Sequence, residues 1–431
     1  MREMSRSGPS AKWYWIALIL AFVLRAGLVV TTDPSKVFTR WSNVGDASLY
    51  DRFGWNLASE GVLGTGDRPS GFIMPGYPVF LAGAYLVTGH VPGMIRWLQV
   101  LLGIATVAAI AHLGRRLAGP AAGAVAALVA AGYPFLIYFV PELLTETLFI
   151  AAFVGMVVTA MELGRSPRLS HGVLHGVWLT VAFMTRPVPL VLEPGVLLLA
   201  QPWKREGRRT RLAGLAAGFL IVAACWGAWI ARNYRVFDKL VPFDTHGGFM
   251  LYTSQLISRG VPHEEVVRRT RAELGYYRGD IENGTLPGGP QGELDADKRA
   301  AEKAREFAQA DPRAALMLIP HNLGSLWLNL DFEEVGRQKS RLGWAGLVGV
   351  VAYVPVLLLG LLGLMRLWRT QRVTFLGLAW ILIGTSLLFG LTHGGKRYRV
   401  ATIDPILIAL AGAETSRWLP RLTRSNGPRS G

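Results

Sequence analysis

The chain has 431 residues, 51% of them hydrophobic, and a mean hydropathy of +0.32. Soluble domains are less apolar, and several apolar runs of about twenty residues follow one another here, which predicts an α-helical polytopic membrane protein. The net charge of +16 would also suit a nucleic-acid-binding protein, but the distribution of that charge excludes this class.

The excess of basic residues is confined to one side of the predicted membrane. The short segments expected in the cytoplasm hold 19 Lys and Arg against two acidic residues, whereas the rest of the chain is nearly neutral. This distribution follows the positive-inside rule and not the basic surface of a nucleic-acid-binding protein. The segments are about 1–12, 114–119, 164–170, 201–211, 365–372 and 417–431.

About ten apolar runs are expected to cross the membrane. The stretch 75–88 is excluded from them because about 14 residues do not span about 30 Å of hydrocarbon. A crossing there would also move the later basic segments outward. The predicted spans are about 13–31, 94–113, 120–138, 142–163, 171–185, 187–202, 212–231, 343–364, 373–391 and 399–416.

These spans divide the chain into three regions. Residues 1–231 form a transmembrane module with a first outer loop, 32–92, that contains two interfacial helices. Residues 232–342 form an extracytoplasmic segment with a polar helix over 293–309, where opposite charges lie three and four residues apart. Residues 343–431 form the last transmembrane helices and a basic tail.

Asp46 stands at the head of the first interfacial helix, where apolar residues recur three and four apart. One interpretation is an N-cap on a helix lying in the interface. The other is a catalytic acid at the outer edge of the membrane. The glycine-rich stretch 61–71 follows this helix, and it is either a mobile loop that closes over a substrate or a simple connector.

Two further acids open the fourth predicted span. Glu142 and Glu146 are four residues apart and therefore share one helix face. Glu142 follows Pro141, and the alternative interpretation is that it caps the helix of this span. Glu146 lies a turn deeper among apolar residues, where a carboxylate is costly unless it is paired or faces water. We therefore expect Glu146 to have a functional role.

Basic residues gather at the same outer level, where the positive-inside rule predicts few of them. A single arginine there is explained by snorkelling to lipid headgroups. Several together, beside carboxylates, indicate a phosphate-binding site, because Arg forms bidentate hydrogen bonds with phosphate. The expected substrate-binding residues are Arg96, Arg186, Arg232, Lys396, Arg397 and Arg399, with Tyr50 and Glu142.

A carboxylate facing a cationic cluster at a membrane surface fits group transfer from a phosphorylated lipid. The carboxylate takes a proton from an attacking hydroxyl, and the cations stabilise the departing phosphate. A transporter would instead place its charges at mid-span and show paired broken helices. A non-catalytic scaffold is the other alternative, and it would keep its function without Asp46.

Several motifs in this order resemble the GT-C superfamily of polyprenyl-phosphate-dependent glycosyltransferases, and specifically glycosyltransferase family 39. This family includes protein O-mannosyltransferases and lipid A aminoarabinose transferases. The motifs are Gly45-Asp46-Ala47 with Tyr50, Pro75-Gly76-Tyr77-Pro78, Leu144-Thr145-Glu146-Thr147-Leu148-Phe149, Thr185-Arg186-Pro187, Arg232-Asn233-Tyr234 with Val236-Phe237 and Val241-Pro242, Gly247-Gly248, and Arg397-Tyr398-Arg399.

The resemblance implies a GT-C fold and an inverting transfer of one sugar from a polyprenyl-phosphate donor to a hydroxyl-bearing acceptor (a glycan, lipid or protein). It assigns Asp46 as the catalytic acid of the first loop and Glu146 as the acidic position of the fourth span. Ala47 stands where protein O-mannosyltransferases carry a second acid, and the sequence contains no β-trefoil domain. Both departures argue against a protein acceptor.

The resemblance also bears on cofactors and location. Some relatives need a divalent cation, but His90, His246 and His393 are scattered and no His or Cys cluster has metal-ligand spacing. No metal ligand is therefore assigned, and a divalent cation is left open. The expected location is a prokaryotic cytoplasmic membrane with the active site facing outward.

Overall fold

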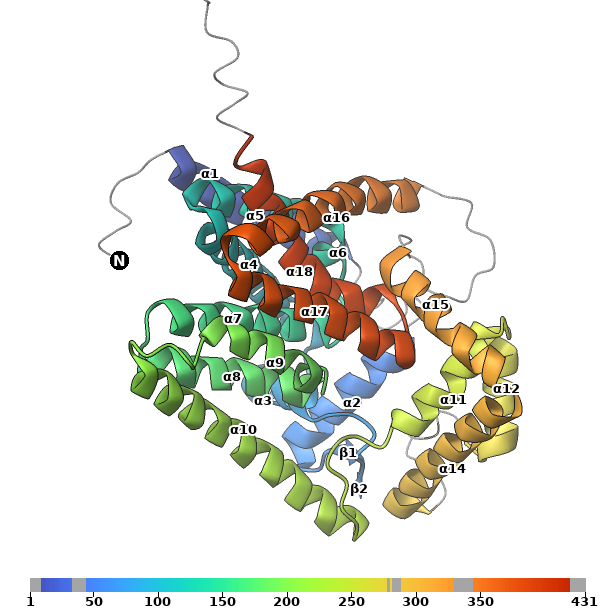
Figure 1. Cartoon of the computed structure of the whole chain (residues 1–431). Coiled ribbons are helices and arrows are strands. Elements are labelled where there is room, and N and C mark those ends of the chain that lie inside the picture. The colour runs from blue at the N-terminus through green and yellow to red at the C-terminus, as the bar shows by residue number, and fades with distance from the viewer. Residues whose placement is uncertain (1–8, 33–43, 277–279, 281–287, 329–343, 419–431) are drawn as a thin grey trace, which may run out of the picture.

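The computed structural model describes residues 9–32, 44–276, 280, 288–328 and 344–418 (Figure 1). This part of the chain is helical apart from one short antiparallel hairpin, which confirms the predicted fold class. Its elements are α1 (Pro9–Thr31), α2 (Val44–Glu60), β1 (Gly64–Thr65), β2 (Arg68–Pro69), α3 (Gly76–Thr88), α4 (Pro92–Ala118), α5 (Pro120–Gly132), α6 (Pro134–Tyr138), α7 (Glu146–Arg165), α8 (Leu169–Thr185), α9 (Pro189–Ala200), α10 (Arg208–Phe237), α11 (Gly247–Ser258), α12 (His263–Leu274), α14 (Gly289–Ala310), α15 (Pro312–Leu328), α16 (Trp344–Thr370), α17 (Arg372–Leu391) and α18 (Lys396–Thr415).

Within the described residues, six helices are long and apolar enough to cross a membrane. They lie in α1, α4, α7, α10, α16 and α17. Four other predicted spans correspond to α5, α8, α9 and α18, of which α5 and α9 have only 13 and 12 residues. The prediction of about ten spans is therefore not confirmed. Both helices expected in the first outer loop are present, as α2 and α3.

Helix α7 is the centre of the bundle. In its apolar window 94% of the residues are buried inside the protein, more than in any other candidate span among the described residues. It packs against α4, α8, α9 and α18. A residue at the start of α7 is therefore held from several sides by helices that are distant in sequence.

Helices α8 and α10 lie side by side at backbone distance (Figure 1). A Cβ on Gly172 would lie 2.3 Å from the carbonyl carbon of Gly214, and one on Gly176 would lie 2.2 Å from the Cα of Gly218. Each helix thus contributes two glycines four residues apart, the arrangement that allows membrane helices to pack closely. This contact fixes the position of α10.

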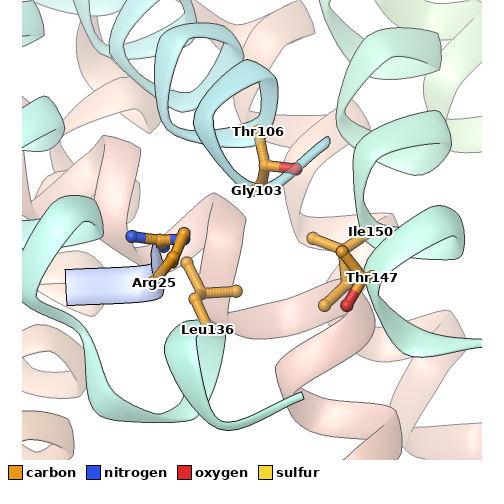
Figure 2. Close-up of a pocket in the computed structure, with 6 residues that line it drawn as sticks. All are labelled: Arg25, Gly103, Thr106, Leu136, Thr147 and Ile150. Atoms are coloured by element: carbon orange, nitrogen blue, oxygen red, sulfur yellow. The ribbon is translucent and has the colours of Figure 1, made fainter. Parts of the chain in front are cut away.

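Arg25 joins α1 to the C-terminal end of α5. Its side chain is fully buried and donates hydrogen bonds to the carbonyl oxygens of Ala130 (3.3 Å) and Ala131 (3.1 Å) at the end of α5. These carbonyls carry the partial negative charge of a helix C-terminus, which a cation stabilises. Arg25 also borders a small cavity beside Thr147 of α7 (Figure 2).

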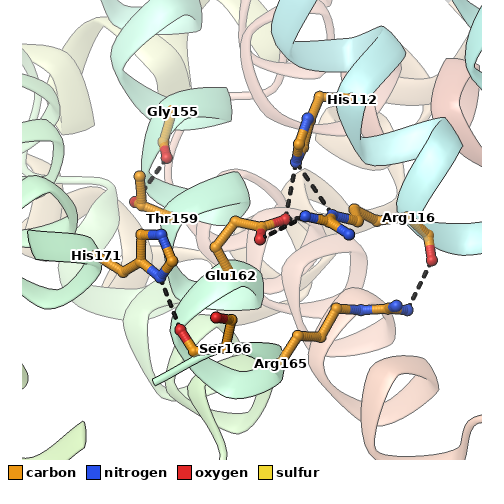
Figure 3. A network of polar contacts seen from close by, with 8 residues as sticks. All are labelled: His112, Arg116, Gly155, Thr159, Glu162, Arg165, Ser166 and His171. Atoms are coloured by element: carbon orange, nitrogen blue, oxygen red, sulfur yellow. Dashed lines mark hydrogen bonds and ion pairs between the residues drawn. The ribbon is translucent and has the colours of Figure 1, made fainter. Parts of the chain in front are cut away.

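Near the C-terminal end of α7, a network of ion pairs and hydrogen bonds joins α4 to α7 (Figure 3). Glu162 accepts hydrogen bonds from Arg116 Nε at 2.5 Å and Nη2 at 2.8 Å, and its carboxylate lies 2.8 Å from His112 Nε2. Arg165 donates to the carbonyl oxygen of Arg116 at 2.6 Å. Two basic residues assigned to the cytoplasmic side from the sequence therefore also have a structural role.

Helices α11 and α14 pack on the first outer loop, and α12 packs against both of them. A second hydrophobic cluster joins Leu49 and Phe53 of α2 to Tyr252 of α11 and to Ala296 and Ala300 of α14. Helix α14 confirms the predicted polar helix over 293–309. The segment that contains α11, α12 and α14 and the first loop therefore form one packed unit.

Candidate active site

Glu146 lies at the first position of α7, and its side chain is 0% exposed. Its Oε1 atom accepts a hydrogen bond from Arg186 Nη2 at 2.6 Å and another from Arg397 Nε at 2.5 Å. Two guanidinium groups, from α18 and from the end of α8, therefore converge on one buried oxygen. Burying a carboxylate is costly unless it is paired in this way.

Asp46 enters the same cluster from the first turn of α2. Arg397 Nη1 donates a hydrogen bond to Asp46 Oδ2 at 2.9 Å. The side chains of Asp46 and Arg397 are 17% and 19% exposed, in contrast to the buried Glu146. Arg397 therefore bridges two carboxylates that are 100 positions apart in the chain, and only the Asp46 end of the bridge reaches solvent.

Arg186 is oriented by its neighbours on both sides. The residue before a proline is restricted to extended backbone. Arg186, which precedes Pro187, accordingly has φ −152° and ψ 134°, and α8 ends just before it. Its Nε and Nη2 donate to Thr145 Oγ1 at 2.9 and 2.5 Å. The guanidinium carbon also lies 5.6 Å from the ring centre of Phe149 and 5.8 Å from that of Tyr398.

Two polar atoms in this cluster are buried without a hydrogen-bond partner in the structure. They are Oε2 of Glu146 and Nη1 of Arg186. An unsatisfied buried donor or acceptor costs about 1–3 kcal/mol. A ligand with both acceptor oxygens and hydroxyl groups would satisfy the two atoms together.

Tyr50 lies one turn after Asp46 on α2 and faces the cluster. Its hydroxyl hydrogen-bonds with Thr145, and burial raises the pKa of Tyr50 while the charges of Arg186 and Arg397 lower it. The ring packs edge-on against Tyr77 of α3, with 5.2 Å between the ring centres. Tyr50 is therefore a neutral hydrogen-bonding group at the edge of the site.

Arg399 does not join the cluster, although the sequence groups it with Arg397. Its side chain is 0% exposed and its Nε lies 3.2 Å from Oδ1 of Asp404, which is equally buried. Its guanidinium carbon lies 3.9 Å from the ring centre of Tyr353, and Tyr133 donates to Asp404 at 2.8 Å. Arg399 therefore lies in a second, fully buried cluster, called here the closed cluster, and its substrate-binding role stays a prediction.

Arg96 also has a supporting position. It is buried and donates from Nε to the carbonyl oxygen of Pro141 (3.0 Å) and from Nη1 to that of Thr32 (3.2 Å). The carbonyl oxygen of Glu142 accepts from Gln99 at 2.7 Å. These bonds fix the turn that precedes α7 and hence the place of Glu146. The side chains of Glu142 and Lys396 are buried, and their substrate-binding roles stay predictions.

Arg232 is bound to the glycine-rich loop. Its Nη1 donates to the carbonyl oxygen of Ser70 at 2.9 Å and its Nη2 to that of Leu63 at 2.8 Å. The loop is held from the other side by Glu293 of α14, which accepts from the Ser70 hydroxyl at 2.7 Å, the Gly71 amide at 2.9 Å and the Thr245 hydroxyl. The structure therefore shows a loop that is tethered on both sides, by Arg232 and by Glu293.

Sequence reasoning did not single out the partner that orients Arg186, nor a polar contact that joins α2 to α3. Thr145 directly precedes Glu146, yet its role depends on Arg186, 41 residues away. Asp51, on α2, accepts hydrogen bonds from Tyr85 and lies 2.9 Å from Nε2 of His90. Neither contact has a signal in local sequence, since each joins separate helices.

The described residues contain no group of three or more His, Cys, Asp or Glu side chains that could hold a metal ion. The two carboxylates of the cluster are bridged by a guanidinium group. No residue is therefore assigned to a metal, and no chemical step is assigned to one.

The helices that are long and apolar enough to cross a membrane indicate a multi-pass membrane protein. Residues 67–229 match the family described as dolichyl-phosphate-mannose-protein mannosyltransferase. This match confirms the resemblance found in the motifs. It includes Glu146 and Arg186, whereas Asp46 and Arg397 lie outside it. No curated protein sequence matches the chain.

The fold is shared with the oligosaccharyltransferase AglB of Archaeoglobus fulgidus. The apo structure matches at a TM-score of 0.56 and 11% identity, over 100% of this chain and 53% of that one. The complex with an inhibitory peptide and a dolichol-phosphate matches at 0.55 and 14%, over 97% and 52%. The chain thus spans about half the length of these structures.

The structure of ArnT from Cupriavidus metallidurans bound to undecaprenyl phosphate also matches, at 13% identity over 99% of this chain and 82% of that one. Its TM-score of 0.41 is below the level at which a shared fold is established.

Proposed function

We propose that this protein transfers a sugar from a polyprenyl-phosphate donor to a hydroxyl group at the outer face of the membrane, with inversion at the anomeric carbon. The family match and the GT-C fold support a membrane glycosyltransferase that uses a lipid-linked donor. The basic segments at the opposite ends of the helices support the outward orientation.

The observation that carries the proposal is the convergence of Asp46, Glu146, Arg186 and Arg397 from four separate parts of the chain. Of the two carboxylates, only Asp46 is reached by solvent. Asp46 is therefore the proposed general base, which takes the proton of the acceptor hydroxyl. Glu146 is fully buried between two guanidinium groups and is proposed to position them.

The phosphate of the donor is proposed to bind at Arg186 and Arg397. The buried Nη1 of Arg186 has no hydrogen-bond partner, and a phosphate oxygen is a strong acceptor for it. As the acceptor oxygen bonds to the anomeric carbon, the bond from that carbon to the phosphate oxygen breaks. The lipid phosphate leaves with the electron pair, and the two guanidinium groups stabilise its charge.

The test is a transfer assay with purified protein in lipid nanodiscs. A panel of polyprenyl-phosphate sugars is offered with mixed glycan, lipid and peptide acceptors, and the products are read by mass spectrometry. We expect the wild type to transfer at least one sugar and Asp46→Asn to lose this activity. Release of lipid phosphate without any product, or activity that persists in Asp46→Asn, would contradict the proposal.

A further inference from the structure

The four charged groups of the site form a series of three ion pairs. Arg186 is paired with Glu146, Glu146 with Arg397, and Arg397 with Asp46, at distances of 2.5 to 2.9 Å. Two carboxylates face two guanidinium groups. A phosphate that enters the site therefore meets cations that are already neutralised, and it has to compete for them.

The two cations differ in what holds them. Arg186 is held by Thr145, by Glu146 and by two aromatic rings, and its remaining Nη1 is already unpartnered. It can receive a phosphate oxygen without losing a bond. Arg397 has its Nε bond to the buried Glu146 and its Nη1 bond to Asp46, at the end of the series that reaches solvent.

We propose that Arg397 exchanges partners when the donor binds: its Nη1 leaves Asp46 for the lipid phosphate while its Nε stays on Glu146. This inference rests on the proposed function and concerns the regulation of the same site. The retained bond to Glu146 lets the guanidinium group turn without leaving the site. An ion-paired carboxylate is a weaker proton acceptor than a released one, so the base becomes competent only after the donor is in place.

This arrangement has a measurable consequence, because Asp46 and the donor phosphate compete for the same N–H group. Removing the charge of Asp46 abolishes transfer and at the same time tightens donor binding. A rigid site, in which Arg397 contacts both groups at once, predicts unchanged or weaker donor binding, since the carboxylate then orients the arginine.

The experiment titrates undecaprenyl phosphate, which carries no sugar, into wild type and Asp46→Asn in nanodiscs and measures binding by native mass spectrometry. We expect a dissociation constant about three- to tenfold lower for the variant, the range for loss of one partly exposed charged competitor. Asp46→Ala gives a second reading of the same effect. Equal or weaker binding to both variants, or no binding to any form, overturns the proposal.

A double-mutant cycle assigns the effect to Arg397. In the Arg397→Ala background the gain from Asp46→Asn is expected to vanish, and a gain that persists overturns the exchange. The matched control is Asp51→Asn, the same substitution on the same helix, because Asp51 pairs with His90 and Tyr85. It is expected to leave the affinity for undecaprenyl phosphate unchanged.

The binding titration and the transfer assay separate two kinds of failure. If wild type transfers a sugar and Asp46→Asn does not bind undecaprenyl phosphate more tightly, the exchange fails and the proposed function stands. If no form binds undecaprenyl phosphate and no sugar is transferred, both fail.

Discussion

Helix α18 carries two arginines that are two residues apart and have opposite surroundings. Arg397 lies in a cluster whose outer carboxylate, Asp46, is 17% exposed. Arg399 and its partner Asp404 are both 0% exposed. Residues that are two positions apart in a helix are separated by about 200° around its axis, so these two side chains leave α18 on nearly opposite sides. One faces the site, and the other faces the interior of the bundle.

The comparison teaches how to separate a functional charge from a structural one. Both clusters contain Arg and Asp, and both lie near the N-terminal end of α18. The closed cluster adds Tyr133 and Tyr353, which pack around the ion pair and anchor α18 to neighbouring segments. The open cluster keeps one carboxylate in contact with solvent. Exposure of one partner, and not the presence of charge, marks the candidate site.

The largest expected effect is on activity at the open cluster. Asp46→Asn is expected to lower the initial rate of sugar transfer about 10²- to 10⁴-fold, the usual contribution of a general base. The free energy of unfolding should change by less than about 1 kcal/mol, because a partly exposed ion pair contributes little to stability. Initial rates and unfolding curves of the same preparation check both statements. A transfer rate within fivefold of wild type would contradict the assignment of Asp46 as the general base.

The closed cluster should show the reverse pattern. Arg399→Met leaves Asp404 buried without its cation and is expected to lower the free energy of unfolding by about 3–5 kcal/mol. The double variant Arg399→Met with Asp404→Leu removes both charges and should recover most of this loss. Denaturant unfolding in detergent micelles measures both. If the double variant were as unstable as the single one, the ion pair would not be the reason for the loss.

A third carboxylate, Glu293, extends the comparison to the outer segment, where it ties the glycine-rich loop to α14. Ser70→Ala removes one hydrogen bond to this buried group and is expected to cost about 1–3 kcal/mol. Amide exchange in 61–71 should also become faster. The matched control is Ser59→Ala, whose hydroxyl bonds only to the carbonyl oxygen of Trp55 at an exposed position. Equal effects of the two substitutions would argue against the tether.

The smallest expected effect is a pH dependence in which two neighbouring groups oppose each other. Burial, with the charges of Asp297 and Glu293, raises the pKa of Asp244 from 3.8 to about 7. Burial lowers the pKa of His246 from 6.5 to about 4. Between pH 4 and 6.5, Asp244 is protonated in the folded chain and ionised in the unfolded chain, so its contribution to stability falls as pH rises. Over the same range His246 is neutral in the folded chain and protonated in the unfolded chain, so its contribution to stability rises.

The two contributions can be separated by substitution. Asp244→Asn removes the destabilising one, so the melting temperature should rise more steeply between pH 4 and 6.5 than in wild type. His246→Gln should make the same slope less positive. Thermal unfolding at four pH values across this range measures both slopes, and a change of the same sign in the two variants would refute the assignment.

Part of the fold could be predicted from sequence because apolar length and charge asymmetry are local signals. The helices corresponding to α2, α3 and α14 lie close to their predicted positions. The start of α7 was placed at 142 and lies at Glu146, because the preceding turn is held by Arg96 and Gln99 of α4. Those contacts cross the bundle and leave no trace in the local pattern.

The site shows the same division. Asp46, Glu146, Arg186 and Arg397 were grouped from their common outer level, and the structure brings them together. Arg399 was grouped with them by proximity in sequence, although helical periodicity already separates it from Arg397. The bond of Arg186 to Thr145 depends on packing between helices and could not be inferred. The catalytic and binding roles stay predictions until the variants are measured.

The glycine contact between α8 and α10 has a consequence far from its own position. Arg232 lies 14 residues beyond Gly218 on the same helix, roughly 21 Å along its axis at 1.5 Å per residue. A methyl group at Gly176 or Gly218 would tilt α10 away from α8, and the displacement would grow along that length toward the residues that bind Ser70 and Leu63. The position of the first outer loop thus depends on two glycines at the contact between α8 and α10.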